Sequence, residues 1–134
     1  MPRDWIAELT NVLLVRDPAE VVASYVRSRA DVVAEDIGLV QQRKLADLLG
    51  ADVPVIDAAD FLRNPEGHLR WLCEHVGVAF TDAMLTCPAG PRDSDGVWAP
   101  HRPRAAVDLP GPARAAVERS RPHYEELYER QVRL

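Results

Sequence analysis

Apolar residues along the chain form two short continuous runs, separated by segments of helical periodicity. Residues 11–15 (NVLLV) are such a run, which is typical of a strand buried on both faces of a parallel sheet. Residues 52–57 (DVPVID) predict a second strand, which Pro54 places near a sheet edge or at a strand start. Because helical segments lie between the two runs, the pattern indicates parallel strands joined by a right-handed crossover.

Capping residues mark where the expected helices begin. Asp17 and Asn64 are each followed by proline, a combination that favours a helix start. The expected helices begin at Pro18, cover about residues 35–49, run from Pro65 to just before Gly77, and cover residues 112–130. The last of these mixes charges of both signs, which predicts a surface helix with a modest apolar seam, and Pro122 should kink or break it. Residues 86–112 are rich in Pro, Gly and Asp and predict a loop.

These elements predict one α/β domain over residues 1–134 that forms part of a larger architecture. A two-stranded parallel sheet cannot cover its own faces and edges. We therefore expect poor coverage of a sheet face or edge near Leu13, Leu14, Val55 and Ile56. Such a surface would favour self-association or pairing with another chain.

Composition narrows the class of protein and its partners. The net charge of -5 over 134 residues argues against non-specific binding to nucleic acid or to anionic membranes. No apolar run approaches the ~20 residues of a membrane span, and no signal peptide is evident at the start. Cys73 and Cys87 form no CxxC motif, which favours a reducing, cytoplasmic setting.

Arg16 and Ser24 are the candidate binding residues. Arg16 lies where the first strand ends and a helix begins, the place where α/β proteins bind anions, and arginine suits phosphate in particular. Ser24 follows eight residues later, so the two side chains can meet only if the Arg16 side chain lies along the helix. On these residues alone, an ion pair between Arg16 and a nearby acid, with Ser24 solvated, is the simpler interpretation.

A family resemblance favours the binding interpretation. Residues 12–29 (VLLVRDPAEVVASYVRSR) resemble the 3′-phosphate-binding segment of the sulfotransferase family, which uses 3′-phosphoadenosine 5′-phosphosulfate as donor. Residues 55–80 (VIDAADFLRNPEGHLRWLCEHVGVAF) are similar to a later strand and helix of the family, and residues 89–101 (AGPRDSDGVWAPH) to a loop of a bacterial sulfotransferase-like subgroup. The resemblance implies a three-layer, P-loop-type sheet flanked by helices. It also implies that Arg16 and Ser24 bind the 3′-phosphate.

The resemblance also implies catalytic parts that this chain lacks. The family has an upstream phosphosulfate-binding loop with a lysine, and usually an upstream histidine. Here Lys44 is the single lysine and follows no glycine-rich loop, while no histidine precedes His68. We therefore expect an N-terminally truncated sulfotransferase-like domain, and we assign no catalytic residue to it. Whether it is an enzyme stays open.

Three functions are compatible with this pattern. The first is transfer of a sulfuryl group from 3′-phosphoadenosine 5′-phosphosulfate to a hydroxyl or amine of an unidentified small acceptor. The second is a non-catalytic module that binds adenosine 3′,5′-bisphosphate or another protein chain, and the third is a fragment with no ligand. No metal site is expected, because the histidines and cysteines lack the spacing of a ligand set. The sequence leaves open the roles of Arg92, Trp98 and His101.

Overall fold

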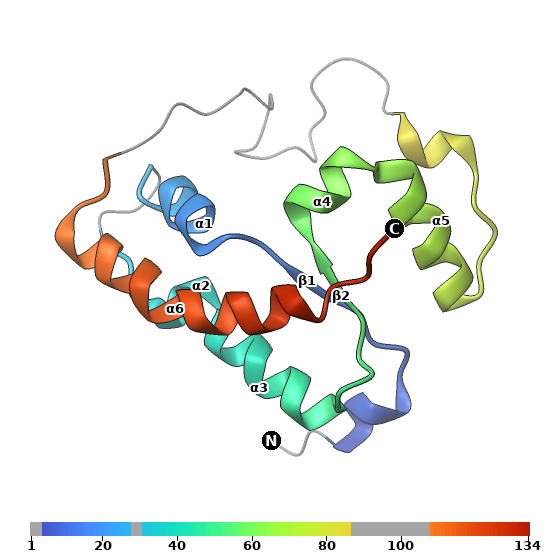
Figure 1. The fold of residues 1–134 in the computed structure, drawn as a ribbon, viewed down its shortest axis with the longest axis horizontal. Coiled ribbons are helices and arrows are strands. Elements are labelled where there is room, and N and C mark those ends of the chain that lie inside the picture. Colours follow the sequence, from blue (N-terminus) through green and yellow to red (C-terminus); the bar gives the residue numbers. More distant parts are fainter. Residues whose placement is uncertain (1–3, 28–30, 87–107) are drawn as a thin grey trace.

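The computed structural model describes residues 4–27, 31–86 and 108–134, which form a mixed α/β structure (Figure 1). Its elements, in order, are η1 (Asp4–Glu8), β1 (Leu13–Val15), α1 (Pro18–Tyr25), α2 (Ala34–Ile37), α3 (Leu39–Leu49), β2 (Val55–Asp57), α4 (Ala58–Arg63), α5 (Pro65–Val76), η2 (Asp82–Leu85) and α6 (Gly111–Glu129). None of the described helices is both long enough and apolar enough to cross a bilayer.

The two strands are parallel neighbours, as the sequence predicts. Leu13 pairs with Val55, and Val15 pairs with Asp57, so both strands end at the same edge of the sheet. Beyond α6 the chain returns to the sheet, where the Val132 N–H donates to the Val55 carbonyl at 2.8 Å and Gln131 forms a parallel bridge with Val55. This C-terminal segment (residues 131–134) therefore lies along β2, on the side away from β1.

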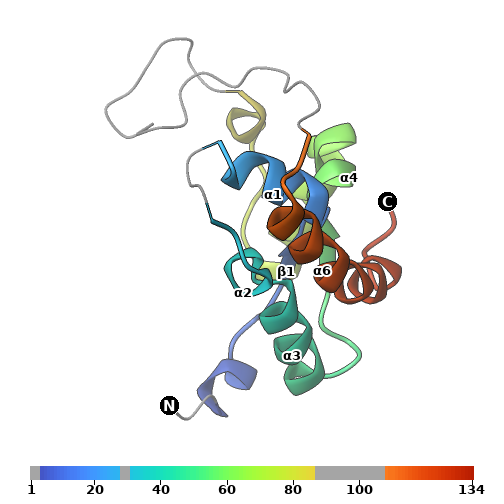
Figure 2. The same cartoon turned by 90° about the vertical axis from the view of Figure 1, so that its left-hand side faces the viewer.

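Helix α6 forms the centre of the helical layer. It packs against α1, α2, α3 and both strands, and Figures 1 and 2 both show α1 and α6 side by side. Its buried residues are Ala113, Ala116, Ser120 and Leu127. The prediction of a surface helix with a modest apolar seam is therefore confirmed, and the alanines of that seam let the helix approach its neighbours closely.

Two hydrophobic clusters meet along α6. The first surrounds Val15, Val55 and Leu127 between the sheet and α3. The second joins Val22 of α1 to Ala113 and other residues of α6. The core therefore fixes α1, which carries Ser24, against α6 and the end of β1, which Arg16 follows.

Several expected boundaries change in the structure. The helix expected over 35–49 is divided at Gly38, whose φ of 79° lies in the left-handed region that glycine favours. Helix α6 continues through Pro122, so of the two predicted alternatives, a kink or a break, the break is wrong. Its tertiary packing outweighs the hydrogen bond that this proline removes. The predicted starts at Pro18 and Pro65 are confirmed.

Coverage of the sheet is uneven, as expected. Leu14 and Ile56 are register partners and therefore share a face. Ile56 is buried at 3% exposure, whereas Leu14 is 58% exposed. The outward carbonyl of Leu14 accepts a hydrogen bond from Gln42 Nε2 at 2.8 Å. The prediction is thus confirmed for β1 and wrong for β2, which has neighbours on both sides.

Candidate functional site

Polar side chains gather at the edge where both strands end. Arg16 and Asp17 follow β1 directly, and Asp57 is the last residue of β2. Each aspartate is also the N-cap of the next helix, Asp17 for α1 and Asp57 for α4. The chain thus repeats one local pattern, in which a buried strand runs into an aspartate that opens a helix.

Asp57 is buried, and its carboxylate is fully engaged. Its Oδ1 accepts hydrogen bonds from the backbone N–H groups of Ala59 and Asp60, at 2.9 and 3.1 Å. Its Oδ2 accepts the hydroxyl of Tyr124 at 2.8 Å. Burial, together with the hydrogen bond to this carboxylate, raises the pKa of the Tyr124 phenol. Asp57 is therefore a structural acceptor that ties α6 to the end of β2.

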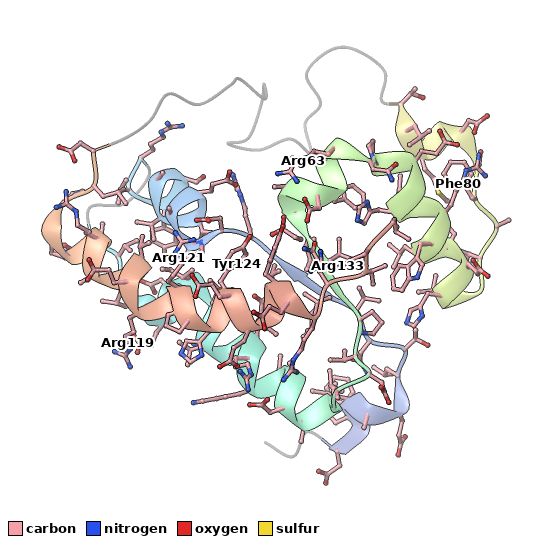
Figure 3. All side chains as sticks on the ribbon, viewed as in Figure 1. Arg63, Phe80, Arg119, Arg121, Tyr124 and Arg133 are labelled. Atoms are coloured by element: carbon pink, nitrogen blue, oxygen red, sulfur yellow. The ribbon has the colours of Figure 1, made fainter. Side chains whose placement is uncertain are left out.

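Asp17 forms an ion pair with Arg121, which lies on α6, the helix that also carries Tyr124. Arg121 Nη1 and Nη2 donate to the two oxygens of Asp17 at 2.7 and 3.1 Å, and Figure 3 shows Arg121 and Tyr124 projecting from α6 toward the sheet and α1. Burial opposes ionisation of Asp17, but the hydrogen bonds from Arg121 and Ala19 outweigh it and lower its pKa. This bidentate pair fixes the start of α1 beside Arg16.

Arg16 pairs with an acid in the first turn of α1. Its Nε donates to Glu20 Oε2 at 3.1 Å, and both side chains are about half exposed. The ion pair that the simpler interpretation predicts is therefore present. Within the part of the chain that the structure describes, Arg16 Nη1 and Nη2 make no further hydrogen bond, so they remain able to bind an anion.

Ser24 lies on the same face of α1 as Glu20, because the two residues are four apart within the helix, whereas Arg16 precedes the N-cap Asp17. Ser24 is partly buried. Since Arg16 reaches Glu20, its side chain runs in the direction of Ser24. That Arg16 and Ser24 together bind an anion stays a prediction.

Comparison with known proteins identifies the family. A family model described as a sulfotransferase domain matches residues 1–123. The chain belongs to the sulfotransferase family. It is also 32% and 33% identical, over 103 residues, to the branched-chain-amino-acid aminotransferase-like proteins 2 and 1 of Arabidopsis thaliana. Those matches cover 75% of this chain but 18% of each relative. No solved structure matches significantly.

Parts of this sulfotransferase-family chain lie outside the described residues. They include the predicted loop residues Arg92, Trp98 and His101. Among the described residues, no three His, Cys, Asp or Glu side chains are grouped to hold a metal ion. The candidate site therefore consists of Arg16, which follows β1, and Ser24 on α1, and both stay predictions.

Sequence reasoning missed the residues that hold this edge together. Asp57, Arg121 and Tyr124 were not among the candidates, although Asp57 follows an apolar run and opens a helix in the same way as Asp17. That repeated pattern could have revealed Asp57 as a cap. Its partner Tyr124 is 67 residues away, and Arg121 is 104 residues from Asp17, so local pattern could not have paired them.

We expect the contribution of the Asp17–Arg121 pair to stability to depend on pH. Arg121→Met should lower the free energy of unfolding at pH 7 by about 1–2 kcal/mol, between the values for exposed and buried charged hydrogen bonds. The folded-state pKa of Asp17 lies below its ordinary value of 3.8. The contribution is therefore complete above that value and is lost as the pH falls through the lowered pKa. Urea unfolding at pH 7 and at about pH 2.5 measures it.

The matched control is Arg119→Met. Arg119 lies on the same helix and pairs with Glu35 at 3.3 Å, but its side chain is largely exposed. Its replacement should change stability by less than about 0.5 kcal/mol at either pH. An equal loss for both variants, or a loss for Arg121→Met that persists undiminished at low pH, would contradict the assignment.

Proposed function

We propose that this chain supplies the 3′-phosphate-binding half of a sulfotransferase nucleotide site. Arg16 binds the 3′-phosphate of 3′-phosphoadenosine 5′-phosphosulfate, and Ser24 donates a hydrogen bond to it. In the parent reaction the sulfuryl group passes from the donor's 5′-phosphate oxygen to an acceptor hydroxyl or amine, releasing adenosine 3′,5′-bisphosphate and a proton. No described residue is assigned to the transfer step itself.

The orientation of the Arg16 side chain carries this proposal. The Arg16–Glu20 contact directs the guanidinium along α1 in the direction of Ser24. A phosphate placed there would bind the terminal nitrogens of Arg16 while Nε keeps its contact with Glu20. The negative charge of Glu20 weakens the site but also holds the guanidinium in place, which lowers the entropy lost on binding.

The arrangement of the strands also supports the three-layer, P-loop-type architecture that we propose for the complete fold. Both parallel strands end at one edge, and helices follow each of them. Open α/β sheets bind their ligands at that edge. Arg16 lies there, and the Asp17–Arg121 pair fixes the backbone next to it.

Titration with two nucleotides tests the proposal. Adenosine 3′,5′-bisphosphate should bind measurably to the unmodified chain, whereas adenosine 5′-monophosphate, which lacks the 3′-phosphate, should bind at least tenfold more weakly. Isothermal titration calorimetry at low ionic strength measures both. Equal affinity for the two nucleotides, or no binding of either, would overturn the proposal. In that case the Arg16–Glu20 pair would be an ordinary surface ion pair.

The exposed side of β1 favours a second candidate function, association with another chain. The Leu14 side chain is exposed, and its backbone faces away from β2, with Gln42 as partner of the carbonyl. An edge of this kind can accept an additional strand. We propose that a second copy of this chain pairs there, because one copy presents both the open edge and the apolar surface beside it.

Sedimentation measurements check this candidate. The mean mass of the unmodified chain should rise with concentration. Leu14→Lys should lower the self-association constant at least fivefold, since a charged side chain on an edge opposes strand addition. Leu62→Lys is the control, because Leu62 is 71% exposed on α4, away from that edge. A monomer at all concentrations, or equal effects of both variants, would reject the candidate.

A further inference from the structure

Two carboxylates lie close to Arg16 in the chain and oppose the binding of an anion there. Glu20 accepts a hydrogen bond from Arg16 Nε, so its charge is offset by Arg16 itself. Asp17 follows Arg16 directly and caps α1. A carboxylate repels a phosphate, and the repulsion is larger where water is partly excluded. Binding of a phosphate at Arg16 is therefore stronger if a second cation offsets the charge of Asp17.

Arg121 of α6 supplies that cation. Its two terminal nitrogens contact the two carboxylate oxygens of Asp17, at 2.7 and 3.1 Å, and the two side chains are only about one-third exposed. The hydrogen bond to Asp17 raises the pKa of Arg121, and the guanidinium is charged at neutral pH. The Asp17–Arg121 pair therefore carries no net charge.

Neighbouring contacts hold this pair in position. The Arg121 guanidinium lies 5.9 Å from the centre of the Tyr124 ring, and the Tyr124 hydroxyl donates to Asp57. Figure 3 shows both side chains projecting from α6 toward the sheet and α1. Asp17 is also held from its own helix, because its Oδ1 accepts the backbone N–H of Ala19 at 2.7 Å. The neutral pair is thus formed before any ligand binds, so binding bears no cost of ordering it.

We propose that Arg121 is a positioning residue of the 3′-phosphate site and acts through Asp17. Its guanidinium neutralises the Asp17 carboxylate and keeps it turned toward α6. The phosphate then meets the terminal nitrogens of Arg16 without an uncompensated negative charge beside it. Arg121 acts without contacting the phosphate, since its two terminal nitrogens face Asp17. This inference rests on the proposed function.

A cycle of four chains tests it: the unmodified chain, Arg121→Met, Asp17→Asn and the double variant. Asparagine keeps an Oδ1 acceptor for the Ala19 N–H, so the cap of α1 is retained without its charge. Arg121→Met should weaken the binding of adenosine 3′,5′-bisphosphate by about three- to tenfold at low ionic strength. In the Asp17→Asn background the same change should alter affinity by less than about twofold. Calorimetric titration measures all four affinities.

This pattern differs from that of a merely structural role. Asp17→Asn also breaks the ion pair, so a residue that only stabilises the fold would leave the double variant at least as weak as Arg121→Met. The loss in Arg121→Met should also shrink to less than about twofold at roughly 0.5 M salt, because it is electrostatic. Circular dichroism checks that each chain is folded at the temperature of the titration.

Two further variants of Arg121 separate charge from hydrogen bonding. Arg121→Lys keeps the charge and should retain affinity within about twofold. Arg121→Gln keeps a donor for Asp17 without the charge, is the second variant should Arg121→Met not fold, and should lose affinity to the same extent. Arg119→Met is the matched control, because it removes the same charge from the same helix at an exposed pair with Glu35. It should leave affinity within about twofold.

The inference is supported if removal of the Arg121 charge weakens binding only while Asp17 is charged. It is overturned if Arg121→Met keeps full affinity, if the double variant binds as weakly as Arg121→Met, or if Arg119→Met loses as much. Equal binding of adenosine 3′,5′-bisphosphate and adenosine 5′-monophosphate by the unmodified chain would reject the proposed function, and this inference with it. A preference for the bisphosphate that persists undiminished in Arg121→Met would reject this inference alone.

Discussion

Asp57→Ala should lower the free energy of unfolding by about 2–5 kcal/mol. The substitution removes the N-cap of α4, which typically contributes about 0.5–2 kcal/mol. It also leaves the partly buried Tyr124 hydroxyl without its acceptor, at a cost of about 1–3 kcal/mol. Since domains of this size are marginally stable, a loss of this magnitude is a large part of the total. Urea unfolding followed by circular dichroism measures it.

Two further variants separate these contributions. Asp57→Asn keeps the Oδ1 acceptor for α4, and its amide can donate to the Tyr124 hydroxyl, so it should cost less than half as much as Asp57→Ala. Tyr124→Phe keeps the cap but leaves Asp57 Oδ2 without a partner, at about 1–3 kcal/mol. The Asp57→Ala, Tyr124→Phe double variant should then be less destabilised than the sum of the two single variants.

Additive losses would show that Tyr124 and Asp57 do not interact energetically. Equal losses for Asp57→Asn and Asp57→Ala would show that the negative charge, rather than hydrogen-bond geometry, is what the site requires. Either result would contradict the account of Asp57 as the acceptor that ties α6 to β2. A loss below about 1 kcal/mol for Asp57→Ala would do the same.

Local pattern was sufficient to predict the elements that carry the candidate site. Asp17 and Pro18 predict the start of α1 because capping and proline geometry depend on neighbouring residues alone. The apolar run before Arg16 predicts a buried strand for the same reason, although only residues 13–15 form it. The position of Arg16 at the carboxyl end of a parallel strand was therefore predictable.

Tertiary features could not be predicted in this way. The burial of α6 depends on small residues that contact three other helices, and charges of both signs along the helix conceal that face. Asp17–Arg121 and Asp57–Tyr124 join parts of the chain that no short pattern relates. The sequence thus indicated where an anion could bind but not what holds that place rigid.

Arg16→Ala should weaken the binding of adenosine 3′,5′-bisphosphate by about ten- to a hundredfold. Charge-assisted hydrogen bonds typically contribute ~1.5–3 kcal/mol, and each 1.4 kcal/mol is a factor of ten in affinity. Ser24→Ala removes a neutral donor and should cost about 0.5–1.5 kcal/mol. Affinity of the unmodified chain should fall as salt rises, because the Arg16 contact is ionic and partly exposed. Calorimetric titration measures all three effects.

Glu20 provides the decisive comparison. If Arg16 binds phosphate, Glu20→Gln removes a negative charge beside the ligand and should raise affinity by about two- to fivefold. If Arg16 serves only its ion pair, neither Arg16→Ala nor Glu20→Gln should change nucleotide binding. Arg70→Ala is the matched control, because Arg70 forms an equally spaced exposed pair with Glu66 on α5.

The Arg70 variant removes the same formal charge as Arg16→Ala, and it should leave the affinity for adenosine 3′,5′-bisphosphate within twofold of the unmodified chain. A similar loss for both arginine variants would show that net charge rather than a defined site governs binding. A lower affinity in Glu20→Gln would show that the guanidinium must be held by Glu20 in order to bind. Opposite effects of removing Arg16 and removing Glu20 are therefore the expected result for a 3′-phosphate site, whereas a surface ion pair with no ligand would make both changes neutral.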